Sequence, residues 1–249
     1  MVAPNGARRD KSHHPNIPLS DDELIDTVLA CQAAGADGAH LHIRDDDGAH
    51  LISAERYRIL LDRLAPMVPG MYLQVTSESA GLFEAAEQQS MMRALKPQYV
   101  SVALREMVRK PEDWQGAAAF YTWAVDNDIQ IQHILYSPQE LNDFLVALNR
   151  GDIRGGHHLL QFVLGSYDGS QVSKPSQVSD FSELLNASAK GHHFDWMLCA
   201  FGAEETNCLV EAIRLGGKAR IGFENSLCNA DGSMAASNAE RVAELVSRL

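Results

Sequence analysis

Short apolar segments and longer amphipathic segments alternate along this chain. The apolar segments have the length of β-strands, and the amphipathic ones show helical periodicity. The predicted strands span residues 2–3, 39–44, 72–75, 99–102, 129–135, 159–163, 195–199 and 219–223. The predicted helices span residues 21–34, 53–65, 82–95, 114–126, 138–149, 178–189, 204–215 and 237–248. This alternation is typical of βα units around a parallel sheet.

Roughly eight such units predict an α/β fold, a single-domain (β/α)8 TIM barrel with parallel strands over residues 1–249. A doubly wound open sheet shows the same alternation, but no G-x-G-x-x-G motif follows the first strand, which disfavours it. Ser20-Asp-Asp-Glu23 forms a capping box before one predicted helix. Gly35 stands where that helix should end. The helix boundaries therefore agree with the predicted units.

The connections also contain irregular segments. Residues 4–19 and 164–177 are rich in Gly, Pro, Ser and Asn and form the two long predicted loops. Loops of this length in a compact domain are often functional. The first predicted strand is unusually short, because a loop begins at Asn5-Gly6.

The composition narrows the range of partners. The net charge is −12, from 33 acidic and 21 basic residues, so we expect no broad phosphate-binding surface and no nucleic-acid partner. Nothing approaches 18 consecutive apolar residues and the N-terminus has no apolar signal core, which predicts no membrane contact and a cytoplasmic protein. The four cysteines lack CxxC spacing, so we expect reduced thiols rather than disulfides or a zinc cluster; they are Cys31, Cys199, Cys208 and Cys228.

The segment 38–45, Gly-Ala-His-Leu-His-Ile-Arg-Asp, carries the most distinctive chemistry. His40, His42 and Arg44 alternate with apolar residues, and this spacing places all three on one face of a strand. Two imidazoles on one face can bind a single metal ion. An isolated H-x-H on an apolar strand also fits a purely structural role.

A second polar pattern lies on the last predicted strand, where Arg220 and Glu224 share one face. In a closed barrel the second and eighth strands both flank the first, so Glu224 can approach His40 and His42. Two histidines and one glutamate form a common catalytic zinc set with an open fourth position. The residues alone therefore favour a metal-assisted enzyme that acts on a carbonyl or carboxylate substrate.

Several motifs together resemble the β-keto acid cleavage enzymes, whose type member is the 3-keto-5-aminohexanoate cleavage enzyme. They are Ala-Pro-Asn-Gly-Ala at 3–7, Pro-Leu-Ser at 18–20, H-x-H-x-R-D at 40–45, G-G-x-x-R-x-G-x-E at 216–224 and Ala-Ala-Ser-Asn at 235–238. The resemblance covers nearly the whole chain in order. It implies a TIM barrel, a homotetramer, and one zinc ion per subunit. The implied reaction is acyl transfer, in which a β-keto acid and acetyl-CoA give acetoacetate and a new acyl-CoA.

The resemblance also implies roles for individual residues. The metal ligands are His40, His42 and Glu224. Arg220 holds an oxyanion or polarises a water molecule. The catalytic hydroxyl corresponds best to Thr76, with Ser77 one residue away as an alternative, and further substrate contacts fall at Ser79 and near Ser101. All four of these hydroxyl residues are also compatible with loop-capping roles.

The chain departs from the family pattern at the proposed base. The type enzyme has an aspartate directly after its zinc-binding glutamate, and this chain has Asn225. Because an amide does not accept a proton near pH 7, the role must move or the mechanism must differ. We expect Glu78 to replace the aspartate, with Asp45 as a weaker candidate.

Two further departures concern the substrate. Arg8 stands where the type enzyme has an acidic residue facing an ammonium group. A guanidinium favours a neutral or anionic β-keto acid instead, unless Arg8 faces solvent or a CoA phosphate. On the segment 130–136 an acidic residue is missing, and His133 or Tyr136 is a candidate to line the pocket. We interpret His133 as a satisfied core residue rather than a ligand.

Adjacent pairs of histidines occur at 13–14, 157–158 and 192–193, and we place these pairs on loops as surface or hinge features. Two other functions stay open. A metal-dependent aldolase or lyase would cleave a keto acid without CoA through the same stabilised enolate. A non-catalytic family member would keep the metal site without turnover, and Asn225 is the only support for that reading.

Overall fold

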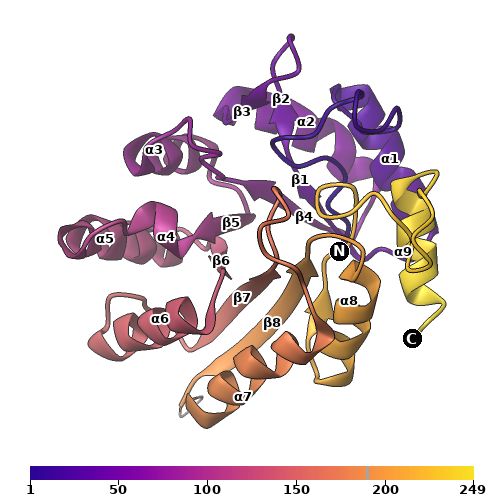
Figure 1. The fold of residues 1–249 in the computed structure, drawn as a ribbon. Coiled ribbons are helices and arrows are strands. Elements are labelled where there is room, and N and C mark those ends of the chain that lie inside the picture. Colours follow the sequence, from indigo (N-terminus) through magenta and orange to yellow (C-terminus); the bar gives the residue numbers. More distant parts are fainter. Residues whose placement is uncertain (189–190) are drawn as a thin grey trace.

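A curled parallel sheet forms the centre of the molecule in a computed structural model that describes residues 1–188 and 191–249 (Figure 1). In these residues seven strands pair in the order β1-β4-β5-β6-β7-β8-β9, and every pairing is parallel. The strands are β1 (Gly38–Leu41), β4 (Tyr72–Thr76), β5 (Tyr99–Ala103), β6 (Gln130–Leu135), β7 (His157–Leu164), β8 (His193–Ala200) and β9 (Lys218–Ala219).

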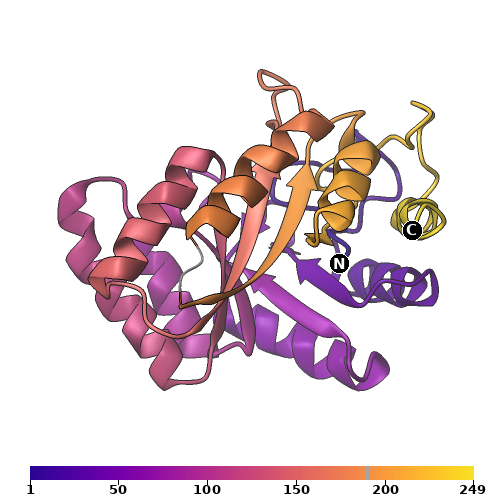
Figure 2. The same cartoon turned by 90° about the horizontal axis from the view of Figure 1, so that it is seen from below.

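The outer face of the sheet is covered by helices (Figures 1 and 2). The longer ones are α1 (Asp21–Ala33), α2 (Ala54–Leu64), α3 (Ala85–Leu95), α5 (Trp114–Asp126), α6 (Pro138–Arg150), α7 (Val178–Ser188), α8 (Glu205–Arg214) and α9 (Asn238–Val246). Each begins and ends within a few residues of its prediction, although residue 189 of the predicted helix 178–189 lies outside the described residues. The capping box at Ser20 and Glu23 is present at the start of α1.

Shorter elements fill several connections. They are the helix α4 (Leu104–Met107) and the 3-10 helices η1 (Ala65–Met67), η2 (Pro111–Asp113) and η3 (Pro175–Gln177). The sequence pattern did not predict them, because one helical turn is too short to show a period.

The N-terminal residues lie between the two edge strands of the sheet. Val2 forms isolated parallel bridges with Ala39 and Ile221. Its backbone N–H donates to Gly38 O at 2.8 Å, and its carbonyl accepts from His40 N at 2.8 Å. The predicted strand 2–3 is thus present as a bridge that hydrogen-bonds to both sides.

Two predicted strands are shorter than expected. The segment 39–44 breaks at His42, because β2 (Ile43–Arg44) turns away and pairs antiparallel with β3 (His50–Leu51). The tight turn between them places Gly48 at φ +81°. The segment 219–223 leaves the sheet after Ala219. Gly222 adopts φ +145°, and a Cβ on this residue would collide with the carbonyl oxygen of Ala3. Both breaks occur at the strand ends whose side chains face the site described below.

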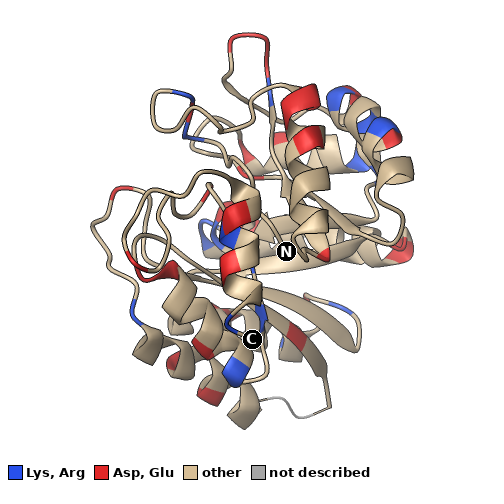
Figure 3. Cartoon of the chain, turned by 90° about the vertical axis from the view of Figure 1, so that its right-hand side faces the viewer, with Lys and Arg blue, Asp and Glu red and all other residues tan. Residues whose placement is uncertain are grey.

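The main apolar core lies between the sheet and the helices, and its large fully buried side chains include Tyr57, Phe120, Phe144 and Phe162. All four cysteines are described and all are free thiols, as predicted. Among the described residues, no helix combines the length and apolar character needed to cross a bilayer. Acidic and basic segments are interspersed over the outer helices and loops (Figure 3).

Candidate metal centre and substrate cavity

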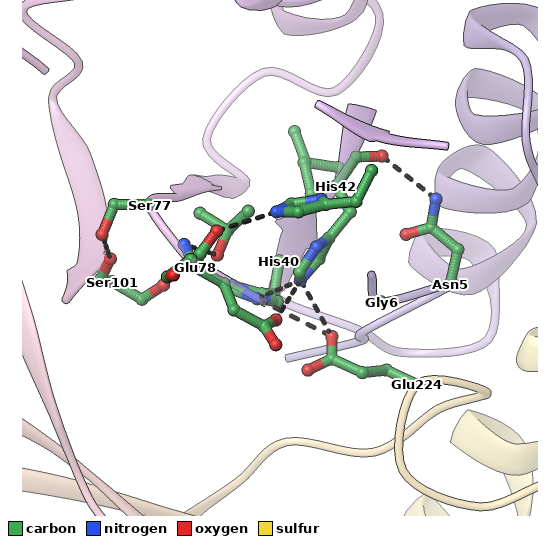
Figure 4. Close-up of polar contacts among 12 residues, drawn as sticks. Asn5, Gly6, His40, His42, Ser77, Glu78, Ser101 and Glu224 are labelled. Atoms are coloured by element: carbon green, nitrogen blue, oxygen red, sulfur yellow. Dashed lines mark hydrogen bonds and ion pairs between the residues drawn. The ribbon is translucent and has the colours of Figure 1, made fainter. Parts of the chain in front are cut away.

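Three side chains from opposite ends of the chain meet where the strands end (Figure 4). His40 lies on β1, His42 follows it, and Glu224 follows β9. The Nε2 atoms of the two histidines are 3.1 Å apart, and Glu224 Oε2 lies 3.7 Å from His40 Nε2 and 3.4 Å from His42 Nε2. One possible ligand atom from each residue lies within 4.8 Å of the others, so the three can share one ion.

The orientation of His40 is set by a buried chain of amides. His40 Nδ1 lies 2.8 Å from Gln74 Oε1, and Gln74 Nε2 donates to Gln132 Oε1 at 3.0 Å. Burial lowers the pKa of His40 to about 3, despite the opposing charge of Glu224, so the ring is neutral. A neutral ring that donates from Nδ1 directs its Nε2 lone pair toward His42 and Glu224, as a metal ligand requires.

Glu224 is held as an ionised carboxylate. Arg220 donates from Nη2 to Glu224 Oε1 at 2.9 Å. Burial by itself raises the pKa of Glu224, but Arg220 and the two imidazoles lower it well below its usual range. Its other oxygen, Oε2, is buried without a hydrogen-bond partner. An unpartnered carboxylate oxygen beside two imidazole nitrogens fits a divalent metal ion with nitrogen and oxygen ligands.

The N-terminal loop closes over this cluster. Asn5 Nδ2 donates to His42 O at 3.0 Å and to Pro18 O at 2.9 Å. Arg44 Nη2 donates to the carbonyl of Gly6. A Cβ on Gly6 would lie 2.5 Å from Glu224 Cγ, so only glycine fits there. Arg44 therefore braces the loop instead of reaching into the metal centre.

A cavity of about 580 Å³ opens beside the cluster, and His40, Glu224 and Arg220 line it. Further lining residues are Arg8, Thr76, Glu78, Tyr136, Tyr167 and Phe201. A second cavity of about 600 Å³ opens at the other end of the strands, lined by residues such as Tyr72 and Asp195. The cavity at the metal cluster is the candidate substrate site because it combines buried charges with space for a ligand.

Glu78 lies at the edge of the metal cluster. Its Oε2 is 3.8 Å from His42 Nε2, and its backbone N–H donates to Thr76 Oγ1 at 3.0 Å. Burial raises the pKa of Glu78, and the nearby carboxylates of Glu224 and Glu106 raise it further. A carboxylate with a raised pKa is a suitable proton acceptor near neutral pH.

The other predicted hydroxyl residues lie outside this cavity's lining. Ser77 Oγ donates to Ser101 O at 2.8 Å, and Ser79 Oγ donates to Phe83 O at 2.6 Å. Ser101 is buried on β5, with its Oγ unpartnered. The side chain of Asn225 is buried, and both of its polar atoms lack partners. The structure describes all four predicted hydroxyl residues, and of these four only Thr76 lines the cavity.

Tyr136 and Tyr167 form aromatic walls of the cavity. The guanidinium of Arg105 lies 3.7 Å from the Tyr136 ring centroid, and that of Arg8 lies 5.3 Å from the Tyr167 ring centroid. Burial raises the pKa of Tyr167 well above its usual range, and Glu224 raises it further. The sequence pattern did not identify Tyr167 as a site residue, although Tyr167 lies in the long predicted loop 164–177.

The other histidines have varied surroundings, and His50 lies beside the cluster, with its ring centroid 5.4 Å from that of His42. His133 is buried in the core between Tyr121 and Phe144, as expected. Its Nδ1 has no hydrogen-bond partner, however, so the expectation of a fully hydrogen-bonded core histidine was wrong. The placement of 157–158 and 193 on loops was wrong, because they begin the paired strands β7 and β8. Their side chains lie at the opposite end of the strands from the metal cluster, since parallel strands share one direction.

Known proteins resemble this chain over most of its length. The model of the beta-keto acid cleavage enzyme family matches residues 1–249. The 3-keto-5-aminohexanoate cleavage enzyme of Acetoanaerobium sticklandii is 24% identical over 249 residues, which cover 97% of this chain and 87% of that protein. The 3-oxoadipate:acetyl-CoA acetyltransferase of Cupriavidus necator is 24% identical over 255 residues, which cover 99% of this chain and 86% of that protein.

Solved structures show the same fold. ObcA, in a ternary complex with a C4-CoA adduct and oxalate, has a TM-score of 0.71 at 15% identity, covering 94% of this chain. This chain spans 63% of the length of that one. A type I 3-dehydroquinate dehydratase from Clostridium difficile has a TM-score of 0.63 at 10% identity, and the match covers 98% of this chain and 91% of that one. The family match over the full length shows that the chain belongs to the beta-keto acid cleavage enzyme family.

Proposed function

We propose that this protein is a zinc-dependent acyltransferase that exchanges acyl groups between a β-keto acid and acetyl-CoA. The reaction is R–CO–CH2–COO⁻ + CH3–CO–SCoA → R–CO–SCoA + CH3–CO–CH2–COO⁻. The observation that carries the proposal is the convergence of His40, His42 and Glu224 beside a cavity, in a chain of this family. A relative named for acetyl-CoA transfer supports the choice of co-substrate.

His40, His42 and Glu224 would hold the zinc ion, with Gln74 orienting His40. Two imidazoles and a carboxylate are a donor set that zinc accepts and that leaves a coordination position for substrate. Bound there, zinc supplies a Lewis acid that stabilises the enolate of the β-keto acid. The protein residues around it must then move one proton and hold the developing charge.

Glu78 is the proposed base. It takes a proton from C2 of the β-keto acid, and C2 then forms a bond to the acetyl carbon of acetyl-CoA as the C–S bond breaks. The released thiolate of CoA adds to the R–CO carbon, and the bond from that carbon to C2 breaks. C2 takes back the proton from Glu78, which leaves acetoacetate and R–CO–SCoA. Arg220, which is buried beside Glu224, offers its guanidinium to the charged oxygens.

Thr76 and Arg8 would complete the substrate site, since both line the cavity. Thr76 Oγ1 also accepts from the backbone of Glu78 and so holds the base in place. Arg8 favours a neutral or anionic R group over an ammonium group. Asn225, Ser77, Ser79 and Ser101 would act by shaping the loops around the site rather than by contacting substrate.

We also propose that residues 1–249 form the catalytic domain, with 2–3 as the first strand of a (β/α)8 barrel, and that the active form is a homotetramer. The backbones of Val2 and Ala3 support the first point, because Val2 hydrogen-bonds to β1 and Ala3 hydrogen-bonds to Ile221. Size-exclusion chromatography with light scattering tests the assembly, for which a monomer would be the contrary result.

The test is turnover of zinc-loaded protein with a panel of β-keto acids, with and without acetyl-CoA. The panel contains 3-oxoadipate, 3-keto-5-aminohexanoate and an uncharged β-keto acid. We expect acetoacetate only when acetyl-CoA is present, and little turnover of the amine-bearing acid. Cleavage without acetyl-CoA would instead support a lyase, and no product from any acid would support a non-catalytic member. Preferred use of the amine-bearing acid would contradict the role of Arg8.

A further inference from the structure

Tyr167 brings a buried hydroxyl group to the metal cluster from a loop of its own. The residue lies between β7 and η3, and its ring packs against Phe201 with centroids 4.4 Å apart. The ring lines the same cavity as His40, Arg220 and Glu224. Neither the metal cluster nor the proposed proton transfer uses this side chain.

The hydroxyl oxygen lies close to Glu224. A Cβ built on Gly6 would be 3.0 Å from Tyr167 Oη and 2.5 Å from Glu224 Cγ, so both groups border the same small space. Tyr167 Oη is buried and has no hydrogen-bond partner. A buried hydroxyl without a partner is unfavourable, so a ligand that accepts its hydrogen bond removes that cost.

The loop fixes the position of Tyr167 before any ligand binds. Ser173 Oγ donates to Phe201 O at 2.8 Å, at the same residue on which the Tyr167 ring packs. Gly165 adopts φ +78°, and a Cβ there would lie 2.6 Å from Ser173 Oγ. The two ends of the loop are therefore held together at the end of β8, which preorganises the hydroxyl group.

An unpartnered phenol alone does not indicate a function. In the described residues, Tyr72 Oη and Tyr121 Oη are also buried without partners. Tyr121 packs beside Phe120 and His133 within the helix–sheet core, and Tyr72 stacks on Tyr99 at the opposite end of the strands. Tyr167 differs because it lines a ligand-sized cavity together with residues of the metal cluster.

We propose that Tyr167 is a catalytic residue whose hydroxyl donates a hydrogen bond to the substrate oxygen that becomes negative when C2 loses its proton. This inference rests on the proposed acyl transfer. A phenol is protonated at neutral pH and can donate one hydrogen bond, and no proton leaves Tyr167 in the reaction. The donor is most valuable when the oxygen carries full charge, so it acts chiefly on the transition state.

The experiment compares Tyr167→Phe with Tyr121→Phe, since each removes one buried, unpartnered phenol oxygen. In zinc-loaded protein, Tyr167→Phe should lower kcat about 100-fold and change the KM of the β-keto acid by less than about threefold. Tyr121→Phe should retain wild-type kcat. Zinc content and Tm of both variants should match the wild type, which shows that neither the metal site nor the fold is lost.

A second measurement does not depend on turnover. Acetylacetone forms a stable enolate, and its binding is followed by calorimetry with the zinc content checked before and after. We expect about tenfold weaker binding in Tyr167→Phe and no change in Tyr121→Phe. Wild-type kcat and wild-type acetylacetone affinity in Tyr167→Phe would overturn the inference. If the wild type transfers no acyl group, the proposed function fails, whereas the acetylacetone titration still decides the role of Tyr167.

Discussion

Glu78 is the side chain on which the proposed proton transfer depends. The Glu78→Gln variant should lose about 100-fold or more in kcat/KM, because a positioned general base contributes at least that much. The base works only when deprotonated, and burial raises its pKa. The wild-type kcat/KM should therefore rise with pH through a pKa above that of an ordinary glutamate, and this acidic limb should disappear in Glu78→Gln. The measurement is a pH profile of kcat/KM.

Asp45→Asn provides the comparison for this assignment. Asp45 Oδ1 accepts from Asp47 N at 3.0 Å and Ala49 N at 2.8 Å, so its carboxylate is used in the β2–β3 turn. We expect this variant to keep the acidic limb. If Asp45→Asn removes the limb and Glu78→Gln keeps it, Glu78 is not the base.

Single residues show what the sequence could and could not predict about the site. His40, His42 and Glu224 are recognisable because their alternation on predicted strands places them on one face and at one end of the sheet. Gln74 was missed, since its role depends on a contact with a residue 34 positions away. Ser77 and Ser79 were candidates for substrate contact with loop capping as the alternative, and their hydroxyls donate to backbone carbonyls.

The connection between the two ends of the chain holds the segment after β9 that carries Glu224. Asn238 is buried at the start of α9, where its Nδ2 donates to Pro4 O at 3.0 Å and its Oδ1 accepts from Phe223 N at 2.8 Å. Asn238→Ala should lower the free energy of unfolding by about 2 kcal/mol, because two buried backbone groups lose their partner. Displacement of Glu224 should also weaken zinc binding about tenfold.

Urea unfolding and zinc titration against a competing chelator measure these effects. Asn16→Ala is the matched control, since Asn16 Nδ2 also donates to a backbone carbonyl, that of Ala236, but at an exposed position. It should change stability by less than about 0.5 kcal/mol. Wild-type zinc affinity in Asn238→Ala would show that this connection does not position Glu224.

Helices and strands were predictable to different degrees. Apolar periodicity and caps such as Ser20 predicted the helices closely, because these signals are local. The breaks after Leu41 and Ala219 were not predicted, because apolar alternation continues through Ile43 and Phe223 while the backbone already leaves the sheet. Closure of the sheet through Val2 depends on partners at both ends of the chain.

Buried histidines should make the whole protein sensitive to acid. Burial lowers the pKa of His133 to about 3, whereas the unfolded chain has an ordinary value near 6.5. As pH falls below about 6.5 the unfolded state therefore takes up a proton that the folded state does not, and stability declines toward pH 3. His50 and His158 have lowered pKa values for the same reason.

His133→Leu isolates one part of this effect. The loss of unfolding free energy between pH 7.5 and pH 5, measured with urea, should be about 2 kcal/mol smaller than in the wild type. An identical pH dependence in His133→Leu and the wild type would mean that His133 is not held neutral in the folded protein.

The account as a whole depends on one metal ion shared by side chains from the two ends of the chain. Equilibrium dialysis against zinc, followed by elemental analysis of wild type and Glu224→Gln, measures this directly. We expect one zinc ion per wild-type chain, held by His40, His42 and Glu224, and at least tenfold weaker binding in the variant. A wild type that retains no zinc, or a variant that binds it equally well, would contradict the central claim.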